Sequence, residues 1–188
     1  SDTPRTYWET EILKLHASGV YLGNNGMALP ADTITRQQAV AMIARSFQIE
    51  GETTTLTYAD GDQVAEYAKG YVAEMTRRGY ITDSKNGYFR PTDPITRAEI
   101  VNILSNMVDV LVQSTTPYSK DTNGTLMINS SGGATLENMK ISGDLILAPG
   151  VQGTVSLENV TIQGDVRNFG GAAITVVNGS EQGTTEPS

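Results

Sequence analysis

The 188-residue sequence contains no cysteine, one histidine, one tryptophan and three phenylalanines. Without cysteine the chain forms neither disulfides nor thiolate metal sites, and a single histidine excludes a multi-histidine metal site. No apolar run reaches the length that spans a membrane. The N-terminal segment SDTPRTYWETEI shows no signal peptide, which is also true of any processed chain.

Positive charge is also scarce. The chain has 13 lysines and arginines against 21 aspartates and glutamates, a formal net charge of −8 and a pI near 4.6. Nucleic acid binding requires a basic face, so nucleic acid is not expected as a partner. With 38% hydrophobic residues and few aromatics, any core is built mainly from aliphatic side chains and tyrosine. Together these exclusions argue against an enzyme.

Two segments in the first part of the chain share one plan. Residues 1–50 and 56–112 each have an aromatic-bearing helical pattern, a glycine, a turn, and a phrase D-x-I-T-R that opens a second helix. The two phrases begin at Asp32 and Asp93, 61 residues apart, and Gly19 and Gly79 stand where helix C-terminal caps belong. The expected inner faces are Ile12 and Leu15, then Val40, Ile43, Ala44 and Phe47, then Val72 and Met75, then Ile100, Ile103, Leu104, Met107 and Leu111. Each unit is too small to bury its own core, so we expect the units to pack on one another.

Both second helices begin with an unfavourably placed arginine. The predicted capping pairs are Thr35 with Gln38 and Thr96 with Glu99. Arg36 and Arg97 then fall on the first helical residue, where the helix dipole disfavours a cation. One explanation is anion binding, because a helix N-terminus attracts anions and an arginine adds a forked donor suited to a carboxylate. The other is an ion pair with the aspartate four residues upstream, Asp32 or Asp93.

The composition changes from about residue 124 to Gly, Asn, Ser, Thr and Val, after the linker-like stretch QSTTPYSKDTNG. The motif L-E-N-x-x-I-x-G-D occurs at Leu136 and again at Leu157, a period of 21. Alternating apolar residues and regular turns at this period predict a parallel β-solenoid. We expect 125–130 and 173–178 to add outer coils, because one coil cannot bury its inner face alone.

The sequence therefore predicts an α+β multidomain chain, in which two helix-loop-helix repeats precede a short parallel β-solenoid. The expected segments are a divergent first repeat (1–54), a second repeat (55–113), a linker (114–124), the solenoid (125–180) and a flexible tail (181–188).

The second repeat reads NGYFRPTDPITRAE, with Asn86, Gly87, Phe89 and Pro91 ahead of I-T-R-A-E. This resembles the S-layer homology (SLH) modules of bacterial cell-surface proteins, which carry I-T-R-A-E after a Gly-x-Phe-x-Pro turn. The first repeat, NNGMALPADTITRQQ, is looser: Leu29 replaces the phenylalanine and two glutamines replace Ala-Glu. The C-terminal part looks like the β-helical segments found beside such modules.

The resemblance implies an extracellular protein attached non-covalently to the cell wall. SLH modules usually come in threes and bind pyruvylated secondary cell-wall polysaccharide in grooves between neighbours, where the arginine of I-T-R meets the carboxylate. The residues this implies are Arg97 and Arg36 as anion contacts, Asn86, Gly87, Asn24 and Gly26 as sugar-facing loops, and Trp8 and Tyr67 as groove or core residues.

A second interpretation is a self-assembling surface-layer or filament subunit, because only two repeats are present and the solenoid ends expose strand edges. A homo-oligomer or surface assembly is expected on this basis. A β-helical polysaccharide-cleaving enzyme is not predicted, since the solenoid is short and has no clustered acid pair beyond its Gly-Asp corners at 143–144 and 164–165.

Two acidic clusters suggest calcium at first sight: Asp60-Gly61-Asp62, and Asp121 with Asn123-Gly124. Neither continues into a twelve-residue loop with a terminal glutamate, and turn chemistry explains both. No metal or cofactor is therefore predicted.

Overall fold

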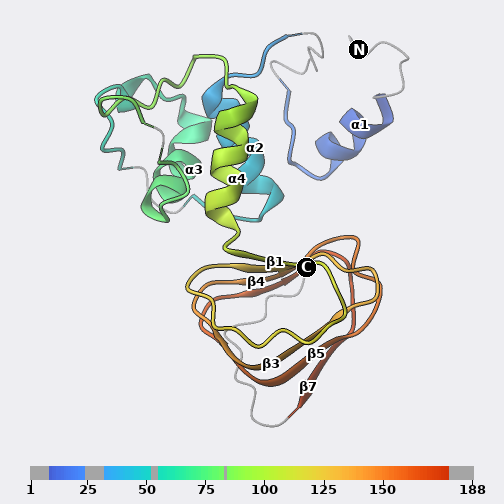
Figure 1. Cartoon of the computed structure of the whole chain (residues 1–188). Helices are drawn as coiled ribbons and strands as arrows, with labels where there is room; N and C mark the ends of the chain where they lie inside the picture. Colours follow the sequence, from blue (N-terminus) through green and yellow to red (C-terminus); the bar gives the residue numbers. More distant parts are fainter. Residues whose placement is uncertain (1–8, 24–31, 52–54, 83, 178–188) are drawn as a thin grey trace. The chain divides into compact units, whose positions relative to one another are not determined.

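The computed structural model describes residues 9–23, 32–51, 55–82 and 84–177. The chain divides between Leu104 and Ser105 into two compact units, a helical unit and a β unit (Figure 1). The predicted order of helices followed by a parallel β-solenoid is confirmed. Each unit is described by itself below.

The helical unit contains the two expected helix-loop-helix repeats. Its helices are α1 (Glu9–Ala17), α2 (Arg36–Ser46), α3 (Glu66–Arg77) and α4 (Arg97–Met107), with a 3₁₀ turn η1 (Gly61–Gln63). Gly19 and Gly79 follow α1 and α3 with φ of +74° and +75°. Only glycine adopts this conformation at little cost, so both positions end their helices as the sequence predicted.

The most extensive helix–helix contact in the described part of this unit joins the two repeats, because α2 packs on α3. Val40 and Ala44 of α2 and Val72 and Met75 of α3 are all fully buried. The α2 end of this contact is also polar, since the Gln37 side-chain oxygen accepts a hydrogen bond from the amide of Ala65 at 2.8 Å. Ala65 is the N-cap of α3, so a glutamine of the first repeat caps a helix of the second.

Three side chains near the end of α3 form a charged cluster. The buried Glu74 accepts hydrogen bonds from Arg77 at 2.6 Å and from Arg78 at 2.7 Å. The hydrogen bond from Arg77 lowers the pKa of Glu74 to about 2 from 4.5, against burial, and Arg78 adds to the effect.

This lowered pKa predicts acid sensitivity of the helical unit. A carboxyl group whose folded pKa lies below its unfolded value stabilises the fold above pH 4.5 and loses that contribution as pH falls toward 2. Because the Arg77 side chain is largely exposed and screened, we expect the loss to be about 1 to 2 kcal/mol. Urea unfolding of Glu74→Gln and the unaltered chain, followed by circular dichroism at several pH values, measures it. The two chains should differ at neutral pH and converge near pH 2, and a constant difference would contradict the assignment.

The β unit is a parallel solenoid with two walls. Its strands are β1 (Val110–Val112), β2 (Leu126–Ile128), β3 (Ala134–Ile141), β4 (Leu145–Leu147), β5 (Val155–Ile162), β6 (Val166–Asn168) and β7 (Ile174–Val177). One wall has the strand order β1-β2-β4-β6 and the other β3-β5-β7, all parallel. Leu136 pairs with Leu157, as the 21-residue period predicts. The two segments expected to add coils contain β2 and β7, within the residues that the structure describes.

The solenoid core is aliphatic, as composition predicted. The inward residues of successive coils stack in rows that exclude water, and this burial is the main force that holds the coils together. The buried residues are Val112, Leu126, Ile128, Ala134, Leu136, Met139, Ile141, Leu145, Leu147, Val151, Val155, Leu157, Val160, Ile162, Val166 and Ala172.

An asparagine shifts the inward pattern in the middle of each long strand. Asn138 and Asn159 have φ of +50° and +54°, a conformation that asparagine tolerates better than most residues. The extra residue explains why Leu136 and Met139 both point inward although they are three positions apart. The Asn159 side chain donates to the Asn138 side chain at 3.0 Å, which links adjacent coils.

The solenoid begins earlier than the sequence suggested. The expected linker 114–124 instead forms the wall opposite β1: Tyr118 bridges Leu136, and Thr122 bridges Ile141, both in parallel. The Asp121 side chain accepts a hydrogen bond from the Lys140 amide at 2.7 Å, so this acidic cluster has a structural role. The polar composition was misleading because the segment pairs through its backbone and contributes few apolar side chains.

Candidate functional site

The two D-x-I-T-R phrases lie side by side in the helical unit. They pair in antiparallel fashion, with Thr35 opposite Pro94. Across this pairing the amide of Ile95 donates a hydrogen bond to the carbonyl of Ile34 at 3.2 Å. The repeated phrases therefore meet each other, and their two helix starts have different surroundings although their sequences are alike.

The pairing fills the N-terminal end of α2. The first amides of a helix have no partner inside it. Here the amide of Arg36 donates to the carbonyl of Asp93 at 2.9 Å, and that of Gln37 donates to the carbonyl of Pro91 at 3.0 Å. Carbonyl oxygens of the second repeat thus occupy the place where an external anion would bind on α2.

Both helix starts contain the expected capping partners. The Gln38 side-chain oxygen accepts the amide of Thr35 at 2.9 Å. At α4 the capping is reciprocal: the Glu99 carboxylate accepts the Thr96 amide at 2.8 Å, and the Thr96 hydroxyl accepts the Glu99 amide at 3.2 Å.

The arginine of the first phrase is buried. Arg36 is 1% exposed, lies 3.3 Å from the Glu99 carboxylate, and has its guanidinium 5.2 Å from the centre of the Phe89 ring. It therefore pairs with a carboxylate of the other repeat, which is a different partner from the upstream aspartate considered above. The expected role of Arg36 as an anion contact is corrected: a side chain this buried holds the repeats together.

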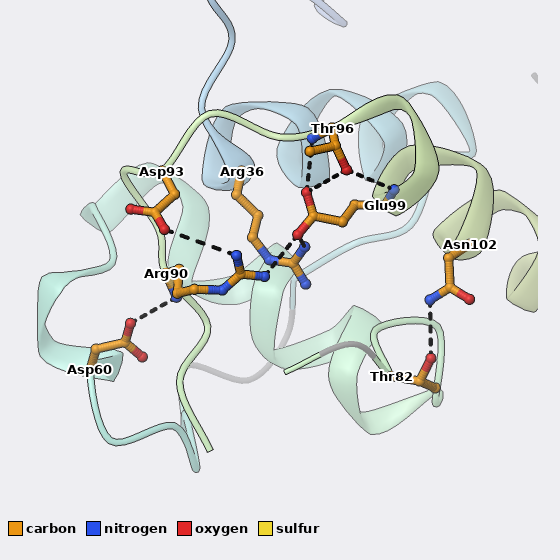
Figure 2. A network of polar contacts seen from close by, with 8 residues as sticks. All are labelled: Arg36, Asp60, Thr82, Arg90, Asp93, Thr96, Glu99 and Asn102. Carbon is orange, nitrogen blue, oxygen red and sulfur yellow. Dashed lines mark hydrogen bonds and ion pairs between the residues drawn. The ribbon is translucent and has the colours of Figure 1, made fainter. Parts of the chain in front are cut away.

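Glu99 connects both arginines of this network to the cap of α4 (Figure 2). One carboxylate oxygen lies 2.8 Å from Arg90 and 3.3 Å from Arg36, and the other accepts hydrogen bonds from Thr96. Burial raises the pKa of Glu99, but the hydrogen bonds from Thr96 and Arg90 and the charge of Arg36 outweigh it and bring the pKa to about 2. The carboxylate is therefore ionised and serves two cations.

The Asp60 side chain fixes the backbone of the loop that carries Arg90 (Figure 2). The buried Asp60 carboxylate accepts the amides of Phe89 at 2.8 Å and Arg90 at 2.7 Å. Arg90 has φ of +59°, an unfavourable conformation for arginine that these hydrogen bonds stabilise. Asp60 of the Asp60-Gly61-Asp62 cluster therefore has a structural role in this loop.

The arginine of the second phrase has the opposite surroundings. Arg97 is exposed, and within the described residues its side chain makes no ion pair or hydrogen bond, with Asp93 or any other residue. The amides of Arg97 and Ala98, the first two of α4, likewise have no partner among the described residues. An exposed guanidinium thus lies next to unpaired helix amides, which is an arrangement that suits an anion.

Asn86 and Gly87 form the tip of a tight hairpin. Their φ angles are +52° and +80°, and the amide of Tyr88 donates to the carbonyl of Lys85 at 2.9 Å. All four residues are exposed. Sequence reasoning did not single out Tyr88, an exposed aromatic side chain beside the loop, although its position within NGYFRP was a usable signal.

Comparison with known proteins identifies the repeat that contains Glu99 and Arg97. A family model described as S-layer homology domain matches residues 57–101. The chain contains an SLH domain. SLH domains are binding and anchoring modules of cell-surface proteins, and the predicted family resemblance and cell-surface location are thereby confirmed.

Three relatives are similar to the chain over part of its length. An amylopullulanase from Thermoanaerobacterium thermosulfurigenes is 24% identical and an exoglucanase from Acetivibrio thermocellus 23% identical, each over 58% of this chain. A surface-layer 125 kDa protein from Lysinibacillus sphaericus is 30% identical over 43% of this chain. The matches cover only 6%, 11% and 7% of these relatives, so the chain corresponds to a small part of each.

The SLH domain contributes Tyr67 to a cleft with the first repeat. Tyr67 is half-exposed and lines a cleft of about 610 Å³ together with Arg45, Gln38 and Asp32. Burial raises the pKa of Tyr67, although Arg45 opposes the effect. Arg97 is not among the lining residues, so the predicted site residues are not all gathered in this cleft.

Three predicted site residues, Trp8, Asn24 and Gly26, lie outside the described residues. In the part of the chain that the structure describes, no cluster of three or more acidic or histidine side chains is arranged to hold a metal ion. None of the described helices is long and apolar enough to cross a bilayer.

Proposed function

We propose that the chain anchors a surface protein to the cell wall by binding an anionic, pyruvylated secondary cell-wall polysaccharide, and that Arg97 contacts its carboxylate. The observation that supports this is the contrast between two equivalent arginines. Arg36 is buried against Glu99 on a helix whose first amides are occupied, whereas Arg97 is exposed beside unpaired amides of α4.

In this proposal the ligand supplies the acceptors for the Arg97 guanidinium and for the first two amides of α4, whereas Glu99 is already occupied by Arg36, Arg90 and Thr96. A carboxylate accepts two parallel hydrogen bonds from a guanidinium and further ones from the adjacent amides. The exposed Asn86-Gly87 loop and Tyr67 remain candidates for sugar contacts, because amide groups and aromatic faces both suit a polysaccharide. For Asn24 and Gly26 a sugar-facing role, and for Trp8 a role in the groove or the core, are proposed from the family resemblance alone.

Co-sedimentation with purified wall sacculi tests the proposal. Arg97→Ala should weaken binding by about tenfold to a hundredfold, because a hydrogen-bonded ion pair contributes roughly 1.5 to 3 kcal/mol. Lys120→Ala removes one exposed positive charge from the solenoid and should leave binding unchanged. The proposal fails if sacculi stripped of the pyruvylated polymer retain the chain equally well, or if Arg97→Ala binds like the unaltered chain.

A further inference from the structure

The loop 86–90, whose tip Asn86-Gly87 is exposed, is attached at three points to the segment that opens the SLH domain. The amide of Ala59 donates to the carbonyl of Gly87 at 2.9 Å. The Asp60 carboxylate accepts two further amides of the loop, one on each oxygen, at 2.8 and 2.7 Å. An ionised carboxylate accepts on both oxygens, which a side-chain amide cannot do. Asp60 therefore fixes two successive loop amides in a way that depends on its chemical type.

The segment that holds the loop is itself fixed to the helical core. Asp60 is buried, and two residues before it the hydroxyl of Tyr58 shares a hydrogen bond with that of Thr76 on α3 at 2.9 Å. The Tyr58 ring also lies 5.5 Å from the ring of Phe89 in the loop. Since α3 is the helix that packs on α2, the loop is held by the core of the unit and not only by contacts within itself.

The loop backbone requires this support because two of its non-glycine residues have positive φ. Asn86 and Arg90 have φ of +52° and +59°, which asparagine tolerates and arginine rarely adopts. Such conformations persist only where the surroundings hold them, and they gather at ligand-binding sites. Asp60 supplies the hold directly, since it accepts the amide of Arg90 itself.

The same loop residue reaches the start of α4 (Figure 2). The Arg90 guanidinium lies 2.8 Å from the Glu99 carboxylate, which accepts the amide of Thr96 at 2.8 Å. The next residue is Arg97, the exposed arginine. Asp60, Arg90 and Glu99 thus form one continuous set of contacts between the exposed loop and the helix end proposed to bind the anion.

We propose that Asp60 is a positioning residue for wall-polymer binding, although its own side chain is buried. It holds the Asn86-Gly87 loop and, through Arg90 and Glu99, the start of α4 at a fixed spacing. A polysaccharide that contacts both then meets a pre-formed surface, and pre-organisation favours affinity because ordering loose groups on binding costs free energy. This role rests on the wall binding proposed above and adds a residue to it.

Co-sedimentation of the full chain carrying Asp60→Asn with purified wall sacculi tests this role. Asparagine has nearly the same shape as aspartate but offers one accepting oxygen, so one of the two loop amides loses its partner and faces an NH₂ group. Binding should weaken about threefold to tenfold, which is the cost of ordering one loosened residue. Amide hydrogen exchange should be faster at Phe89 and Arg90 and unchanged in α3.

Glu74→Gln is the matched control, because it changes another buried carboxylate of the same unit, on α3 and outside this set of contacts. Both variants are expected to lose stability, so binding is measured where circular dichroism shows that both are folded. A purely structural role of Asp60 predicts that the two folded variants bind alike, whereas the positioning role predicts a loss in Asp60→Asn only. Unchanged binding by Asp60→Asn, or an equal loss in Glu74→Gln, overturns the proposal.

Arg90→Gly tests the second half of the path and serves if Asp60→Asn does not fold. Glycine adopts a φ of +59° at little cost and keeps the amide that Asp60 accepts. The side chain that reaches Glu99 is lost, while Arg36 still lies beside that carboxylate. Binding should weaken by a similar factor, and unchanged binding by folded Arg90→Gly also overturns the proposal.

Arg97→Ala in the same assay separates this role from wall binding itself. If Arg97→Ala weakens binding and Asp60→Asn does not, wall binding stands and the positioning role of Asp60 is wrong. If Arg97→Ala binds like the unaltered chain, wall binding through Arg97 fails and the positioning role fails with it.

Discussion

Replacing Glu99 by glutamine is expected to lower the free energy of unfolding of the helical unit by about 3 kcal/mol, because it removes the negative charge that Glu99 places beside a buried guanidinium. Arg36 is 1% exposed and its carboxylate partner is Glu99. Glutamine can still cap α4, since Gln38 accepts the Thr35 amide in the same way in the first repeat. The substitution therefore removes the charge and keeps the cap.

Urea unfolding followed by the helical circular dichroism signal measures this effect, because the described helices all belong to or begin in the helical unit. Arg97→Ala is the control: it changes the equivalent arginine at an exposed position and should alter stability by about 0.5 kcal/mol or less. Adding Arg36→Met to Glu99→Gln should recover part of the loss, because the stranded charge is then gone. Equal effects of Glu99→Gln and Arg97→Ala would contradict the assigned roles.

Replacing Gly143 by alanine is expected to destabilise the solenoid by about 3 kcal/mol, through overpacking at a corner where the coils are in contact. An added Cβ would lie 2.6 Å from the carbonyl carbon of Gly124 in the preceding coil. The same corner is fixed by hydrogen bonds, since Gly143 donates to the carbonyl of Gly124 and accepts from the amide of Gly164, both at 3.1 Å. Relief of the clash requires the coils to separate, which breaks these hydrogen bonds.

Scanning calorimetry of the full chain measures this change in the transition of the β unit. Gly150→Ala is the matched control, because its Cβ would meet only the end of the Asn129 side chain at 3.3 Å. That variant should match or slightly exceed the unaltered chain, since alanine reduces the freedom of the unfolded chain. A normal melting temperature for Gly143→Ala would contradict the tight stacking at this corner.

Local patterns predicted much of the fold. The glycine caps, the capping pairs and the 21-residue period depend on neighbouring residues or on regular spacing, so they can be recognised in one sequence. The segment 114–124 was missed because Tyr118 and Thr122 join the solenoid through backbone pairing, which leaves little trace in composition.

The difference between Arg36 and Arg97 could not be predicted from the repeated phrase. It arises because the two phrases pair with each other, so that Pro91 and Asp93 supply carbonyls to α2 and nothing equivalent reaches α4 within the described residues. One signal was present: Gln37 replaces the alanine of I-T-R-A-E. Its side chain reaches Ala65 of α3, which marks α2 as the helix that the second repeat covers.

The regular coil repeat determines how the length of the solenoid can change. Ala134 pairs with Val155 and Leu145 with Val166, so both walls repeat at the same spacing of 21 residues. One further coil of 21 residues, inserted between the existing coils, would lengthen the solenoid along its axis by about 4.8 Å. Both end coils would stay as they are. The length of the solenoid along its axis is therefore set in equal steps by the number of coils, and duplication of a short stretch of gene suffices to change it.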